Sequence, residues 1–231
     1  MKFEKTEVWG FEHAIRGMRN PLESWNKSDS EYIDIESEEG IELQSKGIYY
    51  KIGKNDLELM QKLIKAGSEH RKFLRQIFVS VDITAPLYWW KEFDTYKVGT
   101  VSNSTSTMHK LASTPITIGC FEMDDFSIFE TNSNDNEKSM NSFEFWNLYL
   151  IPYLEKLRVL FNETKDKQYW KELIRLLPES WLQKRTITMN YENILNMYQQ
   201  RKNHRLVEWS DKFINWAKSL PYANELLFWD K

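Results

Sequence analysis

Residues 77–83, IFVSVDI, have an aliphatic side chain at every second position and constrain the fold more than any other part of the chain. Ile77, Val79, Val81 and Ile83 are aliphatic and alternate with Phe78, Ser80 and Asp82. The four aliphatic residues share one face if the segment is a strand, because successive side chains of a strand point to opposite sides. Pro86 follows closely and suits the first turn of a helix, where its missing N–H has no partner to lose. The sequence therefore predicts a strand that leads into a helix, which extends to about Val98 and ends at Gly99.

Other segments repeat apolar residues three and four positions apart, which is typical of amphipathic helices. Asn55 is expected to cap one such helix and Gly67 to end it, and Asn190 is expected to cap another. The predicted helices cover residues 11–21, with a stop before Pro21, and residues 55–67, 143–166, 167–178, 191 onward and 204–219. Together with strands near residues 1–9, 77–83 and 186–190, they predict an α+β fold. In this fold, long helices pack on a modest, mainly antiparallel sheet.

The chain has 231 residues and no linker rich in proline, glycine or serine, so we expect a single domain over residues 1–231. Residues 26–46 are acidic, rich in hydroxyl groups and weakly patterned. This segment is predicted to be an inserted loop or a small hairpin.

The composition excludes several classes of protein. A net charge of −3 lacks the basic excess of a general nucleic-acid binder, although a small anionic ligand stays possible. Cys120 is the single cysteine, which favours a reducing compartment and no multi-cysteine metal site. The histidines have no metal-binding spacing, the first residues carry no apolar signal segment, and no apolar run has the length of a membrane span. These features predict a cytoplasmic protein without a bound metal.

Two polar groups of residues allow two interpretations each. Residues 102–109, SNSTSTMH, can form a surface turn that satisfies its own backbone, or they can offer neutral donors to phosphate or sugar oxygens. Asn196, Arg201 and His204 can form a polar helix junction. They can also bind a nucleotide, since arginine forks onto phosphates and an amide recognises the edge of a base. Spacing alone does not decide between these interpretations.

The order of several motifs resembles that of the flavin-dependent thymidylate synthases, also called thymidylate synthase complementing proteins. His70 precedes the strand that ends in Ala85-Pro86, a helix follows, and the segments IRLLP (174–178) and NMYQQRKNH (196–204) come later in the family's order. The resemblance extends over about residues 54–225. It implies the fold of that family, whose members make thymidylate from deoxyuridylate with FAD, methylene-tetrahydrofolate and NADPH.

The chain departs from the family's signature motif, RHRxxSxNExSxRY. The residues at the RHR positions are Thr95, Tyr96 and Lys97. After one inserted residue, Asn103 and Ser106 match the motif, whereas Ser104 replaces its glutamate. A charge-assisted hydrogen bond contributes roughly 1.5–3 kcal/mol, so losing two or three arginine contacts would weaken ligand binding by several orders of magnitude.

The resemblance also implies roles for individual residues. Contact with flavin is implied for His70, Tyr96, Lys97, Asn196 and His204. Contact with the nucleotide is implied for Glu92, Asn103, Ser104, Ser106, Arg175 and Arg201. Arg201 is the implied catalytic residue and would polarise the pyrimidine. Glu92 stands at the position of a family glutamine, and its carboxylate would repel a phosphate.

The sequence leads to two hypotheses about function. In the first, the protein is a divergent flavin-dependent thymidylate synthase that binds a pyrimidine nucleotide and FAD and methylates dUMP reductively to dTMP. In the second, it is an inactive homologue that binds, senses or sequesters a nucleotide. The resemblance further implies a homotetramer with sites shared between subunits, and no membrane or nucleic-acid partner.

Overall fold

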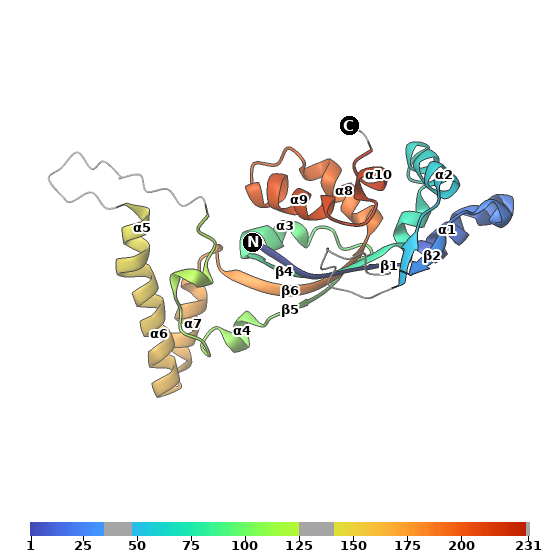
Figure 1. Ribbon diagram of the computed structural model, residues 1–231. Helices are drawn as coiled ribbons and strands as arrows, with labels where there is room; N and C mark the ends of the chain where they lie inside the picture. Colours follow the sequence, from blue (N-terminus) through green and yellow to red (C-terminus); the bar gives the residue numbers. More distant parts are fainter. Residues whose placement is uncertain (35–47, 125–140, 230–231) are drawn as a thin grey trace. The chain divides into compact units, whose positions relative to one another are not determined.

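The computed structural model describes residues 1–34, 48–124 and 141–229 (Figure 1). A four-stranded sheet has the order β1-β4-β6-β5. Its strands are β1 (Lys2–Trp9), β4 (Phe78–Pro86), β5 (Val101–Ser104) and β6 (Leu182–Asn190). The alternation seen in the sequence is confirmed, because Ile77, Val79, Val81 and Ile83 are all buried. The expected α+β class with an antiparallel sheet is confirmed as well.

A second, two-stranded sheet pairs β2 (Glu31–Asp34) with β3 (Ile48–Lys51) in antiparallel fashion. Tyr32 lies opposite Tyr50 in this pairing. Residues 31–34 of the segment 26–46 therefore form a strand that pairs with β3, and the inserted loop or hairpin expected there stays a prediction. Residues 35–47, which the same prediction included, lie outside the described residues.

Contacts between Cα atoms divide the chain into two compact units. The first unit comprises Met1–Glu4, Asp82–Thr95 and Ser102–Thr186. The second comprises Lys5–Val81, Tyr96–Val101 and Ile187–Lys231. The single domain expected from the sequence stays a prediction.

The first unit contains a pair of adjacent helices, α6 and α7, whose apolar faces form its core (Figure 1). The buried residues of this core are Leu111, Ile116, Phe121, Leu154, Leu157 and Leu173. The helices of the unit are α3 (Leu87–Phe93), α4 (Thr107–Lys110), α5 (Ser142–Phe145), α6 (Ile151–Thr164) and α7 (Lys167–Leu176), with a 3-10 turn at Ile118–Cys120. A π-helical segment, Trp146–Leu150, joins α5 to α6, so the helix predicted over 143–166 is continuous but irregular.

Helix α3 is shorter than the sequence predicts, because it ends at Phe93 and not near Val98. Thr95 closes the helix, since both its backbone N–H and its hydroxyl donate to the carbonyl oxygen of Glu92. The adjacent tryptophans, Trp89 and Trp90, are fully buried and pack edge to face with ring centroids 4.9 Å apart. Trp90 also donates a 3.0 Å hydrogen bond to the carbonyl of Gln183. These rings therefore belong to the core.

The second unit is mainly helical. Its helices are α1 (Phe11–Arg19), α2 (Lys54–Lys65), α8 (Tyr191–Arg201), α9 (Ile214–Lys218) and α10 (Ala223–Leu226). Its shorter turns are the 3-10 segments Asn20–Leu22, Trp25–Lys27 and Lys72–Gln76 and the π-helical segment Glu208–Phe213. Asn190 caps α8 as expected, with its side chain accepting from the backbone N–H of Asn193. None of the helices in the described ranges has the length and apolar character needed to span a bilayer.

Helix α2 begins differently from the prediction, because Asn55 does not cap it. Lys54 is already helical, and the cap position falls on Gly53, which has no side chain. Asp29 supplies the missing acceptors: its carboxylate accepts from the backbone N–H groups of Asn55 at 2.9 Å and Asp56 at 3.1 Å. The cap therefore comes from a loop that is distant in sequence.

A buried ion pair anchors the same loop. Arg19 donates from Nε to Asp56 Oδ1 at 2.6 Å, and both side chains are almost completely excluded from solvent. The second oxygen of Asp56 accepts from the hydroxyls of Ser28 and Ser30. Arg19 also donates to the carbonyl oxygen of Lys27. Burial raises the pKa of Asp56, but the hydrogen bonds from Ser30, Ser28 and Arg19 outweigh it and hold the pKa below its ordinary value.

Candidate functional site

Tyr96 and Arg201, two of the residues predicted to bind ligands, meet in the second unit. The Nε of Arg201 donates a 2.9 Å hydrogen bond to the Tyr96 hydroxyl, which itself donates to Gln200 at 3.0 Å. The guanidinium carbon of Arg201 also lies 5.1 Å from the ring centroid of Trp209, which is buried. The guanidinium carbon lies 5.6 Å from the Tyr96 ring centroid as well, so the hydrogen bond and the two aromatic rings limit the orientation of Arg201.

Asn196, also predicted, belongs to a cleft with a volume of about 750 Å³ in the same unit. Its side-chain oxygen accepts a 3.2 Å hydrogen bond from Nη2 of Arg71, and Nε of Arg71 donates to Glu192 at 3.3 Å. Arg75 pairs with the other oxygen of Glu192. We call this cavity the Asn196 cleft. Its lining residues are Ser68, Arg71, Arg75, Phe78, Val98, Gly99, Asn190, Glu192, Asn193 and Asn196.

Charges in the Asn196 cleft are unevenly exposed. Glu192 is buried and faces both arginines, whereas the side chain of Arg75 is 52% exposed. Its hydrogen bond and charge interaction with Glu192 raise the pKa of Arg75, which keeps the guanidinium protonated. The guanidinium groups of Arg71 and Arg75 and the single carboxylate of Glu192 together carry one net positive charge. The cleft therefore favours an anionic ligand that can approach Arg75 from solvent.

The backbone at Gly99 closes one side of the cleft. Gly99 has φ +77°, a conformation that L side chains rarely adopt, and a Cβ there would lie 2.9 Å from Nδ2 of Asn190. Asn193 donates from Nδ2 to the carbonyl of Val98 at 2.7 Å, which fixes this close approach. Lys97, the remaining predicted residue of the segment, is exposed. Glycine at position 99 thus lets the 96–101 segment approach α8 closely.

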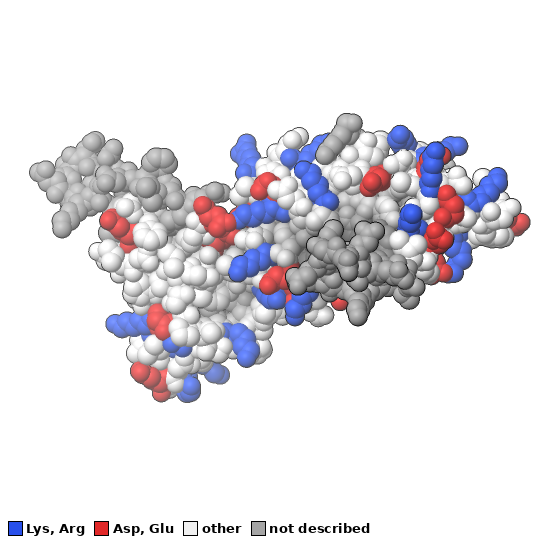
Figure 2. Space-filling model, viewed as in Figure 1, with Lys and Arg blue, Asp and Glu red and all other residues white. Residues whose placement is uncertain are grey.

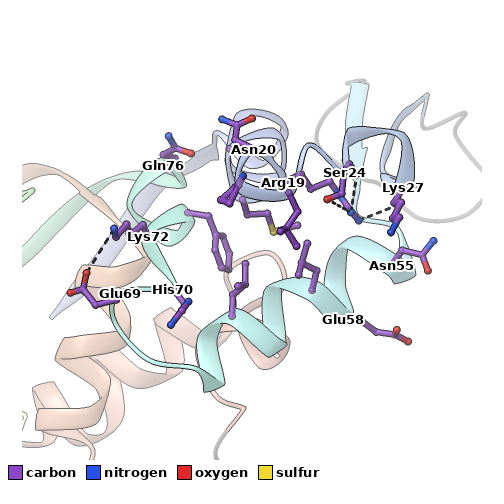
Figure 3. A pocket seen from close by; sticks show the side chains of 17 residues that line it. Arg19, Asn20, Ser24, Lys27, Asn55, Glu58, Glu69, His70, Lys72 and Gln76 are labelled. Carbon is purple, nitrogen blue, oxygen red and sulfur yellow. Dashed lines mark hydrogen bonds and ion pairs between the residues drawn. The ribbon is translucent and has the colours of Figure 1, made fainter.

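His70 lines a different and larger cavity of the second unit, with a volume of about 940 Å³ (Figure 3). Figure 3 shows His70 beside α2, across the cavity from Arg19 and Ser24, with the ion pair of Glu69 and Lys72 at one end. Acidic and basic side chains are interspersed over α1 and α2 (Figure 2). His70 and Asn196 were both predicted to contact flavin, and they line separate cavities here.

His204, the last predicted residue of the second unit, lies just beyond α8. Its Nδ1 accepts a 3.1 Å hydrogen bond from the backbone N–H of Leu206. This bond shapes the turn that leads from α8 to the π-helical segment Glu208–Phe213. His204 therefore has at least a structural role at this turn.

The predicted nucleotide-binding residues other than Arg201 belong to the first unit. Asn103 and Ser104 are exposed on β5, and Glu92 is half-buried on α3. Ser106 caps α4, because its hydroxyl accepts from the backbone N–H of His109 at 3.2 Å. Arg175 is exposed on α7 and pairs with Glu172 at 3.3 Å. The cap at Ser106 agrees with a turn that satisfies its own backbone, while Asn103 and Ser104 are exposed to solvent.

The sequence analysis missed Arg71, Arg75 and Glu192, which organise the Asn196 cleft. Arg71 and Arg75 are four positions apart, a spacing that places side chains near one another in a helical segment, and this was the available signal. Their partner Glu192 follows more than a hundred positions later. No local pattern could connect the three residues.

Comparison with known proteins gives a likeness at the level of the fold. No protein-family model matches the chain, and no curated protein matches it. A solved structure of flavin-dependent thymidylate synthase ThyX from Helicobacter pylori, complexed with FAD and dUMP, has a TM-score of 0.65 and 17% identity, over 100% of this chain and 99% of the other. A second structure of that enzyme with FAD and dUMP has a TM-score of 0.63 and 18% identity, over 100% and 98% of the two chains. This chain therefore has the fold of the flavin-dependent thymidylate synthases, as its motifs led us to expect.

Proposed function

We propose that the protein is a divergent flavin-dependent thymidylate synthase-like protein that binds a pyrimidine nucleotide and FAD. The observation that carries this proposal is the Asn196 cleft, where two arginines and three asparagines surround a single carboxylate. Guanidinium and amide groups bind oxygen-rich anions, and phosphates are the shared feature of FAD and dUMP. The solved structures with the same fold hold both of these ligands.

The residues of the cleft fit a flavin cofactor in two respects. Gly99 lets the backbone approach the side chains of Asn190 and Asn193, which a Cβ would meet, and so keeps these amides at the wall of the cleft. Arg75 is exposed enough to bind a phosphate without losing all contact with Glu192. In this proposal Arg75 and Lys97 replace the arginines of the RHR motif, and Asn196 and Tyr96 position the cofactor. FAD, when bound, supplies hydride transfer.

Arg201 is the residue to which we assign the polarisation of the pyrimidine. Its hydrogen bond to Tyr96 and its contact with Trp209 restrict the guanidinium before any ligand arrives. Such preorganisation lowers the cost of stabilising charge that develops on a carbonyl oxygen. The reaction we propose is the reductive methylation of dUMP to dTMP, with methylene-tetrahydrofolate and NADPH as co-substrates.

A second function is favoured by the pairing of Glu192. This carboxylate forms ion pairs with both Arg71 and Arg75, so a ligand phosphate must compete with it for the two guanidinium groups. Together with Thr95-Tyr96-Lys97 in place of RHR, the pairing supports an inactive homologue that senses or sequesters a nucleotide. In that case, the cleft binds a nucleotide without redox chemistry.

Titration with FAD separates the two functions. The visible absorption spectrum of the purified protein is recorded first, and then FAD is titrated by isothermal calorimetry, followed by dUMP. An oxidised-flavin spectrum or saturable FAD binding supports the flavoprotein. A colourless protein that binds dUMP and rejects FAD supports the inactive homologue, and rejection of both overturns the proposal.

Turnover completes this experiment. The flavoprotein should oxidise NADPH in a dUMP-dependent way and release tritium from dUMP labelled at C5. Absence of both reactions at saturating FAD excludes the synthase reaction and leaves ligand binding to be judged by the titration.

We further propose a homo-oligomer, a tetramer by analogy with the family, that works in the cytoplasm. Supporting this assembly, α5, α6 and the π-helical segment between them expose large apolar side chains to solvent. These are Phe143, Phe145, Leu148, Tyr149 and Tyr153, each at least 47% exposed. Exposed apolar surface of this kind commonly marks a protein interface. Light scattering coupled to size exclusion would give the mass of a tetramer, and a monomer mass would contradict the assembly.

A further inference from the structure

A small cavity in the second unit, apart from the Asn196 cleft, is walled by aromatic rings. Its volume is about 310 Å³, enough for a small organic molecule. Trp9, Phe11, Tyr32 and Tyr50 line it, together with the carboxylate-bearing Glu12. They come from the end of β1, the start of α1 and the β2–β3 hairpin. Three separate elements thus contribute aromatic side chains to one space.

The rings are fixed at steep angles to one another. Tyr32 and Tyr50 lie opposite each other in the hairpin, with centroids 4.8 Å apart and planes at 65°, so they form a corner. Phe78 stacks on the Trp9 indole at 5.8 Å, yet Trp9 remains 43% exposed. Phe11 is buried against Tyr191 and Tyr222 and forms a rigid base. Walls of this kind can surround a compact group on several sides.

The charges around the cavity favour a cation. Glu12 is held at its wall by a 2.7 Å hydrogen bond from the Tyr32 hydroxyl. Among the described lining residues there is no lysine or arginine, and His13 is the other ionisable side chain besides the tyrosines and Glu12. The bond to Glu12 raises the pKa of Tyr32, and burial together with the charges of Asp56 and Glu12 raises the pKa of Tyr50. The carboxylate of Glu12 is thus the nearest charge to the Tyr32 hydroxyl at this wall.

We propose that this cavity binds a quaternary or methylated ammonium group, with Trp9, Tyr32 and Tyr50 facing the cation and Glu12 balancing its charge. Aromatic faces attract cations through the ring quadrupole, and a quaternary ammonium group has no N–H that would need an acceptor. Such a group therefore matches the aromatic wall better than a primary ammonium, which would leave donors unsatisfied. This site is independent of the function proposed above, because it shares no lining residue with the Asn196 cleft.

The test compares choline with its neutral isostere, 3,3-dimethylbutan-1-ol, by isothermal calorimetry on the full chain. The two molecules have the same shape, so a difference in affinity reports the charge. We expect choline to bind at least about tenfold more tightly than the alcohol. Equal affinities, or no saturable binding of choline or tetramethylammonium below about 10 mM, would overturn the proposal.

Two sources of the ammonium group are distinguished with the same method. Choline represents a free metabolite, and a short peptide with one trimethyl-lysine represents a modified protein. If the trimethyl-lysine peptide binds tightly and the same peptide with unmodified lysine does not bind, the ligand is a protein partner. If choline binds and neither peptide does, the ligand is a small molecule. Either result supports the site, and equal binding of the two peptides argues against it.

Variants locate the binding site. Trp9→Leu and Glu12→Gln change exposed side chains, so the fold should survive, and each should weaken choline binding about tenfold. Trp25→Leu is the matched control, since Trp25 is 49% exposed and does not line the cavity. Choline affinity that is unchanged in Trp9→Leu and Glu12→Gln would place binding elsewhere and refute the assignment. Circular dichroism checks that each variant is folded.

Discussion

Arg201 donates a hydrogen bond of 2.9 Å to the hydroxyl of Tyr96, although the two residues are 105 positions apart in the sequence. Tyr96 stands where the flavin-dependent thymidylate synthases have the histidine of their RHR motif. A neutral phenol in this place leaves Arg201 as the charged member of the pair. The pair can therefore hold one guanidinium in place without the repulsion that a nearby second cation would add.

Replacing Arg201 tests its assignment to the nucleotide. Arg201→Ala should weaken dUMP binding by about 10–100-fold, because a hydrogen bond to a charged group contributes roughly 1.5–3 kcal/mol. Arg201→Lys keeps the charge and should recover part of the affinity. Calorimetric titration with dUMP measures both variants. An Arg201→Ala protein that is folded and binds dUMP as the wild type does would exclude a role in nucleotide binding.

Glu192 is expected to limit anion binding in the Asn196 cleft. Glu192→Gln removes the carboxylate that pairs with Arg71 and Arg75, so pyrophosphate, used as a phosphate probe, should bind several-fold more tightly. The same change should lower thermal stability, because two cations then lie close together. Arg75→Ala is the control and should weaken pyrophosphate binding. Unchanged pyrophosphate affinity in both variants would mean that phosphates do not bind in this cleft.

The Arg19–Asp56 ion pair makes stability dependent on pH. Because the folded-state pKa of Asp56 lies below its ordinary value of 3.8, the contribution of this group is complete above that value and is lost as the pH falls through the lower, folded-state pKa. Asp56→Asn leaves a buried arginine without its counter-charge and should cost about 3–5 kcal/mol of unfolding free energy at neutral pH.

Urea unfolding between pH 3 and pH 7 measures this effect. The difference between wild type and Asp56→Asn should shrink below about pH 3.8, since the unfolded wild-type chain then takes up a proton that the folded carboxylate excludes. Glu58→Gln, on the exposed side of α2, is the control and should change stability little at any pH. A difference that is constant across the pH range would show that Asp56 is not the titrating group.

Substitution of Trp90 should lower stability more than most other substitutions in the first unit. It is buried, packs against Trp89 and Phe93, and donates to the carbonyl of Gln183. Trp90→Leu removes the packing and leaves that carbonyl without its donor, so a loss of about 3–5 kcal/mol is expected in chemical denaturation. Trp25→Leu, at an exposed position, should cost less than about 1 kcal/mol. Similar losses for the two variants would contradict the assigned burial.

Local patterns in the sequence predicted the elements whose causes are local. Alternation over residues 77–83 and the Asn190 cap depend on neighbouring residues, and both are confirmed. The predicted end of α3 was wrong because Thr95 bonds back to Glu92 before Gly99 is reached, and a side-chain bond of this kind is not visible in apolar periodicity. The cap of α2 was wrong for a different reason, since Asp29 acts from another segment.

In the candidate site, too, features that the order of motifs indicates were predicted, and features that depend on tertiary packing were not. Its residues were predicted by their order along the chain, and the structure brings Tyr96 and Arg201 into contact. It also places His70 and Asn196 in separate cavities, which no motif indicates. The ion pairs of Arg71 and Arg75 with Glu192 depend on tertiary packing, so they became visible only in three dimensions.

The cap that Asp29 provides has a consequence for hydrogen exchange at the start of α2. The first turn of α2 receives its hydrogen bonds from a loop 26 and 27 positions earlier, so an isolated peptide of this helix would fray at its start. The amides of Asn55 and Asp56 should therefore exchange with deuterium at the rate at which the loop undocks, more slowly than a frayed helix end allows. The start of α2 has these hydrogen bonds only while the distant loop is docked, and its amides report that contact.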